Sequence, residues 1–227
     1  MTLVNTTKTN MTFKGAIFDL DGVIVNTVPL HFTAWQYLFT TLHGLPFTKK
    51  DYEEKVDGKP RLDSVCLLLP QLSLAEAIAA GELKQQRYLQ LLNEKAIEQF
   101  PSSVKLIHEL HKKGVLLAAA SSSKNANYIL EKTNLSAMFT AIISGHDFTQ
   151  GKPNPEIFLK AAAALKLDVK DCIVFEDALA GVQAAKAGGF CCVGIDRHNN
   201  PSNYIGADLV VKDLAEVNYK SLAKLLR

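Results

Sequence analysis

The sequence predicts an α/β fold: a parallel β-sheet with a small helical segment inserted near its beginning. After about residue 100, apolar runs of strand length alternate with helical patterns, as in βαβ units. One more apolar run, Gly15–Phe18, precedes them. Between it and the next strand, a stretch of about seventy residues shows helical spacing only. A length of 227 residues suits one compact domain with a modest insertion.

The predicted strands are short, continuous apolar runs, as expected for strands that are buried on both faces. They comprise residues 15–18, 115–120, 142–143 and 172–175, and a later run contains Cys191 and Cys192. The helices between them are predicted from apolar stripes. These stripes are Val104, Ile107 and Leu110; Ile129 and Leu130; Ile157, Phe158, Ala161 and Leu165; and Leu179, Val182 and Ala185. Gly114 and Gly188-Gly189 are typical helix ends.

The inserted segment is predicted to form a small helical cap. Its stripes are Trp35, Leu38, Phe39 and Leu42, then Leu83, Leu89, Leu92 and Ala96. We therefore expect a core of residues 13–28 and 99–227, a cap of residues 29–98, and hinges near 25–29 and 96–101. Residues 1–12 are polar and rich in Thr and Asn, without the apolar centre of a signal peptide, and are predicted to be a disordered leader.

Composition points to a cytoplasmic protein that binds small molecules. The 25 basic and 23 acidic residues nearly balance, and no basic run is longer than two, so we expect no nucleic-acid partner. No stretch approaches the ~20 apolar residues of a membrane span. The four cysteines lack CxxC spacing, which suggests free thiols in a reducing compartment. Adjacent Cys191 and Cys192 could bind a metal, but alternation along a strand favours core packing.

Two carboxylates follow the first predicted strand. Asp19 and Asp21 leave the same face if the strand geometry continues, at the carboxyl edge where ligands bind to parallel sheets. Gly22 then lets the chain turn away. Taken alone, Asp-x-Asp-Gly is also typical of a plain surface turn.

Three later polar clusters also follow apolar runs. They are Ser121-Ser122-Ser123-Lys124-Asn125, Lys152-Pro153 and Glu176-Asp177. Four chemically distinct clusters at the ends of four buried strands favour one functional site. Individually, Lys152 could be a solvated surface group, and Glu176-Asp177 could cap the helix that begins near Ala178.

This ordered set resembles the haloacid dehalogenase-like superfamily of phosphotransferases, over nearly the whole chain from about Phe13 to Leu226. Its start is most similar to the β-phosphoglucomutase subfamily. The matching residues are Asp19-Leu20-Asp21-Gly22-Val23-Ile24 with Thr27, His31 and Trp35; Gly58 with Arg61 and Ser64; Lys84 before Tyr88; and Ser121-x-Ser123-Lys124-Asn125. The resemblance implies a Rossmann-like core under a helical cap that opens and closes. Asn26 and Ser122 depart from the usual residues of the family.

The chemistry of the site follows from its carboxylates. Asp19 is the candidate nucleophile, because attack by an ionised carboxylate on phosphorus gives an acyl phosphate. Asp21 is the candidate general acid and base, and a neighbouring carboxylate is one way to raise its pKa. Mg²⁺ would separate the anionic nucleophile from phosphate, with Asp19, Glu176, Asp177 and the Asp21 carbonyl as ligands.

The remaining residues are assigned by the resemblance. Ser121, beside Ser122, and Lys152 would bind the transferring phosphoryl group. Arg61, Ser123, Lys124 and Asn125 would bind a second, non-reacting phosphate; without the resemblance, Arg61 and Lys124 would be taken for surface charges. Thr27, His31 and Lys84 would link the position of the cap to Asp21, although packing explains His31 and Trp35 nearly as well. Gly58, Ser64 and Trp35 complete the substrate-binding set.

The resulting hypothesis is an Mg²⁺-dependent phosphotransferase that interconverts β-D-glucose 1-phosphate and glucose 6-phosphate through an aspartyl phosphate. A sugar-phosphate phosphatase with the same residues is the nearest alternative. A dehalogenase or a catalytically inactive binding protein fits less well, because Asp19, Asp21, Lys152 and Asp177 are all present. The expected partner is a small phosphorylated sugar, and the expected state is a monomer.

Overall fold

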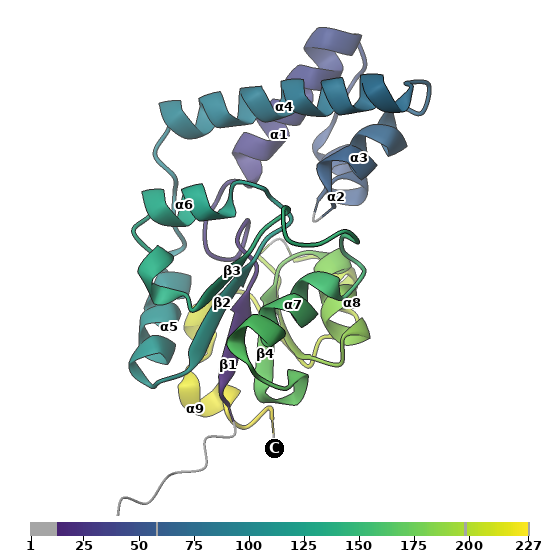
Figure 1. The fold of residues 1–227 in the computed structure, drawn as a ribbon. Helices are drawn as coiled ribbons and strands as arrows, with labels where there is room; N and C mark the ends of the chain where they lie inside the picture. The colour runs from purple at the N-terminus through teal and green to yellow at the C-terminus, as the bar shows by residue number, and fades with distance from the viewer. Residues whose placement is uncertain (1–12, 58, 198, 227) are drawn as a thin grey trace, which may run out of the picture.

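The computed structural model describes residues 13–57, 59–197 and 199–226, so the predicted leader lies outside the described residues. The core is a six-stranded sheet in the order β3-β2-β1-β4-β5-β6, with all pairings parallel. Its strands are β1 (Gly15–Phe18), β2 (Leu116–Ala120), β3 (Ala141–Ile143), β4 (Cys172–Glu176), β5 (Cys191–Ile195) and β6 (Leu209–Val211). This confirms the α/β parallel-sheet prediction (Figure 1).

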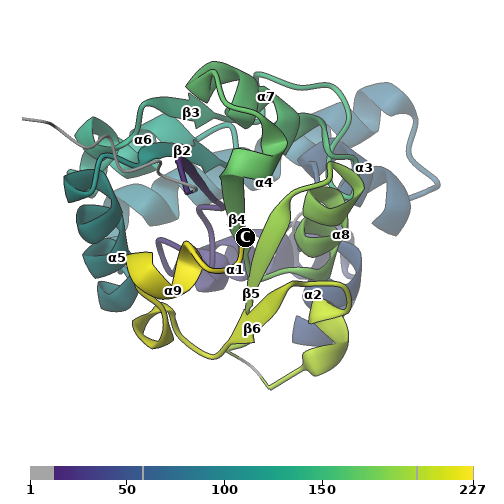
Figure 2. The same ribbon diagram turned by 90° about the horizontal axis from the view of Figure 1, so that it is seen from below.

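Helices cover both faces of the sheet (Figure 2). On one face lie α5 (Pro101–Lys112) and α9 (Tyr219–Leu222), and on the other lie α7 (Glu156–Leu165) and α8 (Leu179–Ala187). Successive strand residues enter opposite layers: Ala16 and Phe18 belong to the first cluster and Ile17 to the second. The helix α6 (Ala126–Lys132) packs on the first cluster, just after β2. Burial on both faces explains why these strands are continuous apolar runs.

Four helices inserted between β1 and α5 lie over the carboxyl edge of the sheet (Figure 1). They are α1 (Val28–Gln36), continued by a π-helical turn at Tyr37–Leu42, then α2 (Lys49–Lys55), α3 (Arg61–Leu68) and α4 (Leu74–Glu94). Trp35, Phe39, Tyr52 and Val65 belong to a separate hydrophobic cluster within this group. The structure therefore has the predicted helical cap. The division at 13–28, 29–98 and 99–227 stays a prediction.

The two linkers between core and cap run side by side. Val25 and Gln99 form an antiparallel bridge, and the Phe100 N–H donates to the Ile24 carbonyl at 3.0 Å. Asn26 reinforces the pair, because its backbone N–H donates to the Glu98 carbonyl and its side-chain Nδ2 donates to Glu98 Oε2, both at 2.8 Å. Asn26, which departs from the residue usual in the family that the chain resembles, thus connects one linker to the other.

The cap differs from its predicted pattern in one informative way. Helix α4 ends at Glu94, so Ala96 lies beyond it, and Leu83 is 44% exposed. Leu92 is buried as predicted, but the buried face of the helix also carries Gly81, Lys84 and Tyr88. Lys84 on this face lines the cavity between the cap and the carboxyl edge of the sheet, where a polar side chain replaces an apolar one. No helix in the described part of the chain is long and apolar enough to cross a membrane.

Candidate active site

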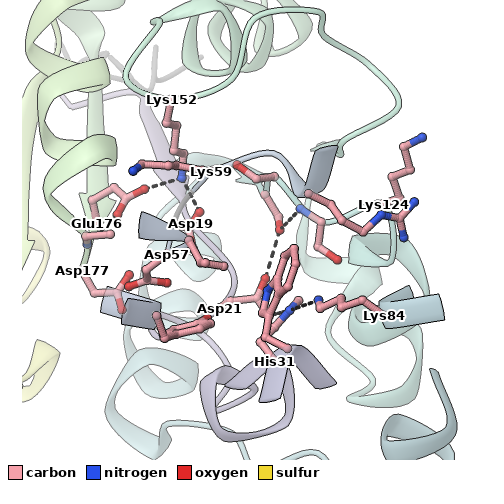
Figure 3. A pocket seen from close by; sticks show the side chains of 18 of the residues that line it. Asp19, Asp21, His31, Asp57, Lys59, Lys84, Lys124, Lys152, Glu176 and Asp177 are labelled. Carbon is pink, nitrogen blue, oxygen red and sulfur yellow. Dashed lines mark hydrogen bonds and ion pairs between the residues drawn. The ribbon is translucent and has the colours of Figure 1, made fainter. Parts of the chain in front are cut away.

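A cavity opens between the carboxyl edge of the sheet and the cap (Figure 3). Both parts line it. Most of the residues predicted for the site lie in its wall: Asp19, Asp21, His31, Trp35, Arg61, Lys84, Ser121, Ser122, Ser123, Lys124, Lys152, Glu176 and Asp177. The folded chain therefore brings the four strand-end clusters together, as expected from their positions in a parallel sheet.

Asp19 extends the first strand by one residue, since its backbone N–H donates to the Phe175 carbonyl at 3.0 Å. Its Oδ1 accepts a hydrogen bond from Lys152 Nζ at 2.5 Å, and the same ammonium contacts Glu176 Oε1. Burial raises the pKa of the Asp19 carboxyl well above its usual value, against the influence of Lys152. Burial would lower the pKa of Lys152, but Asp19 and Glu176 together raise it. Lys152 is thus a buried, charged cation shared by two carboxyl groups.

Asp21 turns toward the first helix of the cap. Its Oδ1 accepts from the Thr27 hydroxyl and lies 3.6 Å from His31 Nε2, while Oδ2 accepts from Ser121 Oγ at 3.2 Å. Burial would raise the pKa of the Asp21 carboxyl, but the hydrogen bonds from His31, Thr27 and Ser121 outweigh it and lower the pKa. The direction is opposite to the raised pKa that its neighbouring carboxylate predicts, because these donors stabilise the ionised form.

A buried polar chain links Asp21 to α4. Lys84 Nζ lies 2.8 Å from His31 Nδ1, and the imidazole stacks on Tyr88 with centroids 3.9 Å apart. An ionised carboxylate only accepts hydrogen bonds, so His31 Nε2 carries the proton and Nδ1 accepts from Lys84. Burial, helped by the positive charge of Arg61, lowers the pKa of Lys84 to about 7. Thr27, His31 and Lys84 therefore connect the cap to Asp21.

The second acidic pair lies across the cavity. Glu176 Oε2 accepts from the Ala178 N–H at 2.9 Å, but α8 begins at Leu179 and no side chain among the described residues caps it, so the helix-capping alternative is not what the structure shows. Asp177 lies against Gly22, where an added Cβ would stand 1.8 Å from Asp177 Oδ2. Burial raises the pKa of the Asp177 carboxyl well above its usual value, and nearby Asp57, Glu176 and Asp19 raise it further.

This donor set suits a hard divalent cation. Within residues 13–57, 59–197 and 199–226, no three potential ligands converge closely enough to hold a metal ion. However, Asp19, Asp21, Glu176 and Asp177 all line one cavity, and Lys152 is the ammonium between Asp19 and Glu176. The raised pKa values of Asp19 and Asp177 reflect burial beside other carboxylates. Oxygen ligands and excess negative charge are what Mg²⁺ binds.

Away from this acidic group, Arg61 of the cap is linked to the core through Gln85 of α4. Arg61 donates to Gln85 Oε1 at 2.8 Å and to Glu82 Oε1 at 2.6 Å, and Gln85 Nε2 donates to Asn125 Oδ1 at 2.8 Å. Ser123 Oγ accepts from the Asn125 N–H at 3.1 Å. Of the residues that the resemblance assigns to a second phosphate, Arg61 in the cap and Asn125 in the core are thus joined through Gln85.

A few predicted residues lie outside the cavity wall. Thr27 is buried behind Asp21, and Ser64 bonds to the Pro60 carbonyl at 3.1 Å. Asn125 contacts the cavity network through Gln85. Gly58 lies outside the described residues.

Sequence reasoning missed several wall residues, most of them in the cap: Tyr52, Val56, Asp57, Lys59, Gln85 and Ala178. Asp57 faces Asp177 (Figure 3), and burial, with the nearby charge of Glu176, raises its pKa to about 6. Tyr52 and Gln85 lie on helices of the cap, whereas Val56, Asp57 and Lys59 lie in the turn between α2 and α3, so the position of all five over the sheet depends on tertiary packing. Only the position of Asp57 and Lys59 on either side of Gly58, a residue matched by the resemblance, could have singled them out.

Known proteins resemble this chain over most of its length. A family model described as a haloacid dehalogenase-like hydrolase matches residues 13–189. The chain is 34% identical over 216 residues to a β-phosphoglucomutase of Bacillus subtilis, covering 92% of this chain and 93% of the relative. It is 30% identical to validoxylamine A 7'-phosphate phosphatase of Streptomyces hygroscopicus, covering 91% of this chain and 97% of that protein.

Solved structures also include a similar β-phosphoglucomutase. The crystal structure of β-phosphoglucomutase from Clostridium difficile matches with a TM-score of 0.87 and 28% identity, over 94% of this chain and 97% of that chain. Relatives of both kinds act on phosphorylated compounds, so the chain is a phosphotransferase or phosphatase. The protein belongs to the haloacid dehalogenase-like family and is similar to its β-phosphoglucomutases.

Proposed function

We propose that this enzyme is an Mg²⁺-dependent β-phosphoglucomutase, which interconverts β-D-glucose 1-phosphate and glucose 6-phosphate. The observation that supports the proposal is that two separate sets of residues, both assigned to phosphate by the resemblance, lie at one cavity. Asp19, Ser121 and Lys152 form the reacting group, and Arg61 with the Ser123 to Asn125 segment forms the distant one. A bisphosphate intermediate that presents each end in turn to Asp19 needs both.

The transfer is proposed to proceed in two displacements. An Asp19 carboxylate oxygen attacks phosphorus, the bond between phosphorus and the sugar oxygen breaks, and Asp21 gives its proton to that oxygen. In the second displacement the free hydroxyl of a glucose monophosphate attacks the aspartyl phosphate, the bond between phosphorus and the Asp19 oxygen breaks, and Asp21 takes the proton of that hydroxyl, which forms the 1,6-bisphosphate. Attack by Asp19 on the other phosphate of this bisphosphate then releases the isomeric monophosphate. Lys152 and Ser121 stabilise the negative charge on the transferring group.

Asp21 needs a proton for the first displacement, although its hydrogen bonds keep it ionised in this arrangement. His31, Thr27 and Ser121 are the donors responsible. His31 lies on α1, so movement of the cap would withdraw this donor and raise the pKa of Asp21. Through Lys84 and His31, cap position would then control the protonation of Asp21.

Asp19, Glu176, Asp177 and the Asp21 carbonyl are the proposed Mg²⁺ ligands. Bound there, Mg²⁺ would neutralise charge between the phosphate and the Asp19 carboxylate. The Glu176 carboxylate already accepts hydrogen bonds from Lys152 and from the Ala178 N–H. To bind Mg²⁺ as well, it would have to use the same two oxygens for all three partners.

A sugar-phosphate phosphatase is the second candidate, favoured by the similarity to validoxylamine A 7'-phosphate phosphatase over almost the whole of both chains. The two activities share the first displacement. They differ in whether water or a sugar hydroxyl attacks the aspartyl phosphate.

We also propose that the enzyme works as a cytoplasmic monomer. The four free cysteines, Cys66, Cys172, Cys191 and Cys192, are consistent with a reducing compartment. Light scattering coupled to size-exclusion chromatography tests the monomer, and a mass of twice 24.9 kDa would contradict it.

The deciding experiment mixes the protein with β-D-glucose 1-phosphate, Mg²⁺ and a trace of the 1,6-bisphosphate, and follows glucose 6-phosphate and free phosphate together. A mutase forms glucose 6-phosphate without matching free phosphate. Arg61→Ala should reduce this reaction far more than hydrolysis of p-nitrophenyl phosphate, which has no second phosphate. Free phosphate as the main product would instead support the phosphatase.

A further inference from the structure

Gln85 is the residue through which the cap and the core meet on the distant side of the cavity. Both ends of its carboxamide are engaged. Oε1 accepts from Arg61 Nη1 at 2.8 Å, and Nε2 donates to Asn125 Oδ1 at 2.8 Å. One side chain of α4 therefore spans from a residue of α3 to a residue just before α6 in the core.

The cap holds Arg61 in one orientation. The guanidinium uses Nη1 for Gln85 and Nη2 for Glu82, which lies three residues earlier on the same helix. The Arg61 side chain also lies across Gly81, where an added Cβ would stand 3.5 Å from Nε. Because α4 offers two acceptors and a bare backbone at this point, the guanidinium lies against the helix with its direction set by both acceptors.

On the core side, the Gln85 contact also determines the orientation of the Asn125 amide. Asn125 Nδ2 donates to Ser123 Oγ at 3.3 Å, while Oδ1 accepts from Gln85 Nε2. The two ends of the Asn125 amide could exchange places if Gln85 were absent. The hydrogen bond from Gln85 is the one that directs Oδ1 to the cap and leaves Nδ2 toward Ser123. Gln85 thus orders Asn125 and, through it, the hydroxyl of Ser123.

We propose that Gln85 is a positioning residue for the second phosphate: it joins Arg61 of the cap to Asn125 of the core, so that the distant phosphate site is assembled only when cap and core are together. This inference rests on the proposed function, since it assigns Gln85 to the second of the two phosphate sites. The hydrogen bonds of Gln85 lie away from Asp19 and the reacting group. A substrate would therefore need a second anionic group to use the site that Gln85 positions, so the enzyme would select substrates with two anionic ends.

The test measures binding in an Asp19→Asn background, which removes the nucleophile. Gln85→Met keeps the length and helical preference of the side chain but has no amide. Its affinity for glucose 1,6-bisphosphate should fall about tenfold by calorimetry, the effect of one or two lost hydrogen bonds. The fall for inorganic phosphate should be much smaller. Gln86→Met, at the next and exposed position of α4, is the matched control and should keep the original affinity.

A double-mutant comparison separates positioning from general damage. If Gln85 acts through Arg61, adding Gln85→Met to Arg61→Ala should cost much less affinity than Gln85→Met alone, whereas an unrelated structural effect would add in full. Equal losses for the bisphosphate and for inorganic phosphate would also overturn the inference. If Arg61→Ala weakens bisphosphate binding but Gln85→Met does not, the inference is wrong and the proposed function stands. If neither weakens it, both are wrong.

Discussion

Lys84 is a lysine whose ammonium is surrounded by the cap on almost all sides. It is 3% exposed, contacts His31 Nδ1, and lies 4.8 Å from the ring centre of Tyr88 and 5.1 Å from that of Trp35. Burial opposes the charge, and so does Arg61, which is why the pKa falls to about 7. The aromatic faces recover only part of this cost.

The shifted pKa of Lys84 gives the stability of the protein a predictable pH dependence. Between pH 7 and about 10 the unfolded chain binds more protons at this residue than the folded chain, so the free energy of unfolding rises with pH. Below pH 7 both states are protonated and the full penalty remains. Lys84→Met removes the penalty. The variant should therefore be more stable than the original at pH 7, and this advantage should shrink by pH 9.

Urea denaturation at the two pH values measures the difference. Lys95→Met, which changes the lysine at the C-terminal boundary of α4, is the control. An advantage of Lys84→Met that stays constant from pH 7 to pH 9 would contradict the shifted pKa.

Single residues also show which predictions a sequence pattern supports. Asp19 and Asp21 were found from their spacing after a strand, since alternation along a strand is a local property. Lys84 was found only through the family resemblance. The apolar stripe of Leu83, Leu89, Leu92 and Ala96 predicted the helix and the burial of Leu92, but not the burial of Lys84, because a buried lysine depends on partners from α1.

Among the elements, the turn after β1 is the one most tightly coupled to the chemistry. Gly22 has φ of +87°, and a Cβ on it would meet the carboxylate of Asp177 after β4. Arg197, after β5, donates to the Gly22 carbonyl at 3.3 Å, and Tyr204 donates its hydroxyl proton to the Asp177 carbonyl at 2.8 Å. The ends of three strands therefore hold this turn in place.

Gly22→Ala should lower both stability and activity. The positive φ costs about 1–2 kcal/mol for a residue with a Cβ, and the displaced Asp177 carboxylate should reduce phosphoryl transfer about 10²-fold. Gly114→Ala is the matched control, because Gly114 has φ of +79° but an added Cβ would have no neighbour within 4 Å.

Thermal unfolding and steady-state rates of the two variants separate the effect of backbone strain from the effect of the steric clash with Asp177. Both should lose similar stability, and only Gly22→Ala should lose activity. Equal activity in both variants would show that the close approach of Gly22 to Asp177 has no role in the reaction.

Across the whole molecule, cap and core touch at Gly151 as well as at Gln85. A Cβ on Gly151 would stand 2.1 Å from Cγ of Pro60, the residue just before α3. A proline ring cannot rotate away, so a larger side chain at 151 would have to push the cap from the core. Next to Lys152, the cap thus approaches the core more closely than a side chain at position 151 would allow.

Gly151→Val should hold the cap further open. We expect slower formation of glucose 6-phosphate and a larger share of phosphate lost to water, because in the proposed mechanism closure of the cap would exclude solvent from the aspartyl phosphate. Gln150→Val changes an exposed neighbour in the same loop and is the control. Small-angle scattering should show a larger radius of gyration for Gly151→Val alone. An unchanged ratio of transfer to hydrolysis in a visibly opened variant would argue against solvent exclusion by the cap.

The sequence by itself determined the parallel sheet, the presence of the cap and the grouping of Asp19, Ser121, Lys152 and Glu176 at one edge. These follow from local periodicity and from the rule that parallel strands bring their carboxyl ends together. Only the tertiary structure decided how the cap faces that edge. The hydrogen bonds of Gln85 with Asn125 and of Lys84 with His31, and the electrostatic effect of Asp57 on Asp177, join residues from 40 to 120 positions apart. Such pairs leave no periodic trace in the chain, because they depend on the angle at which two packed bodies meet.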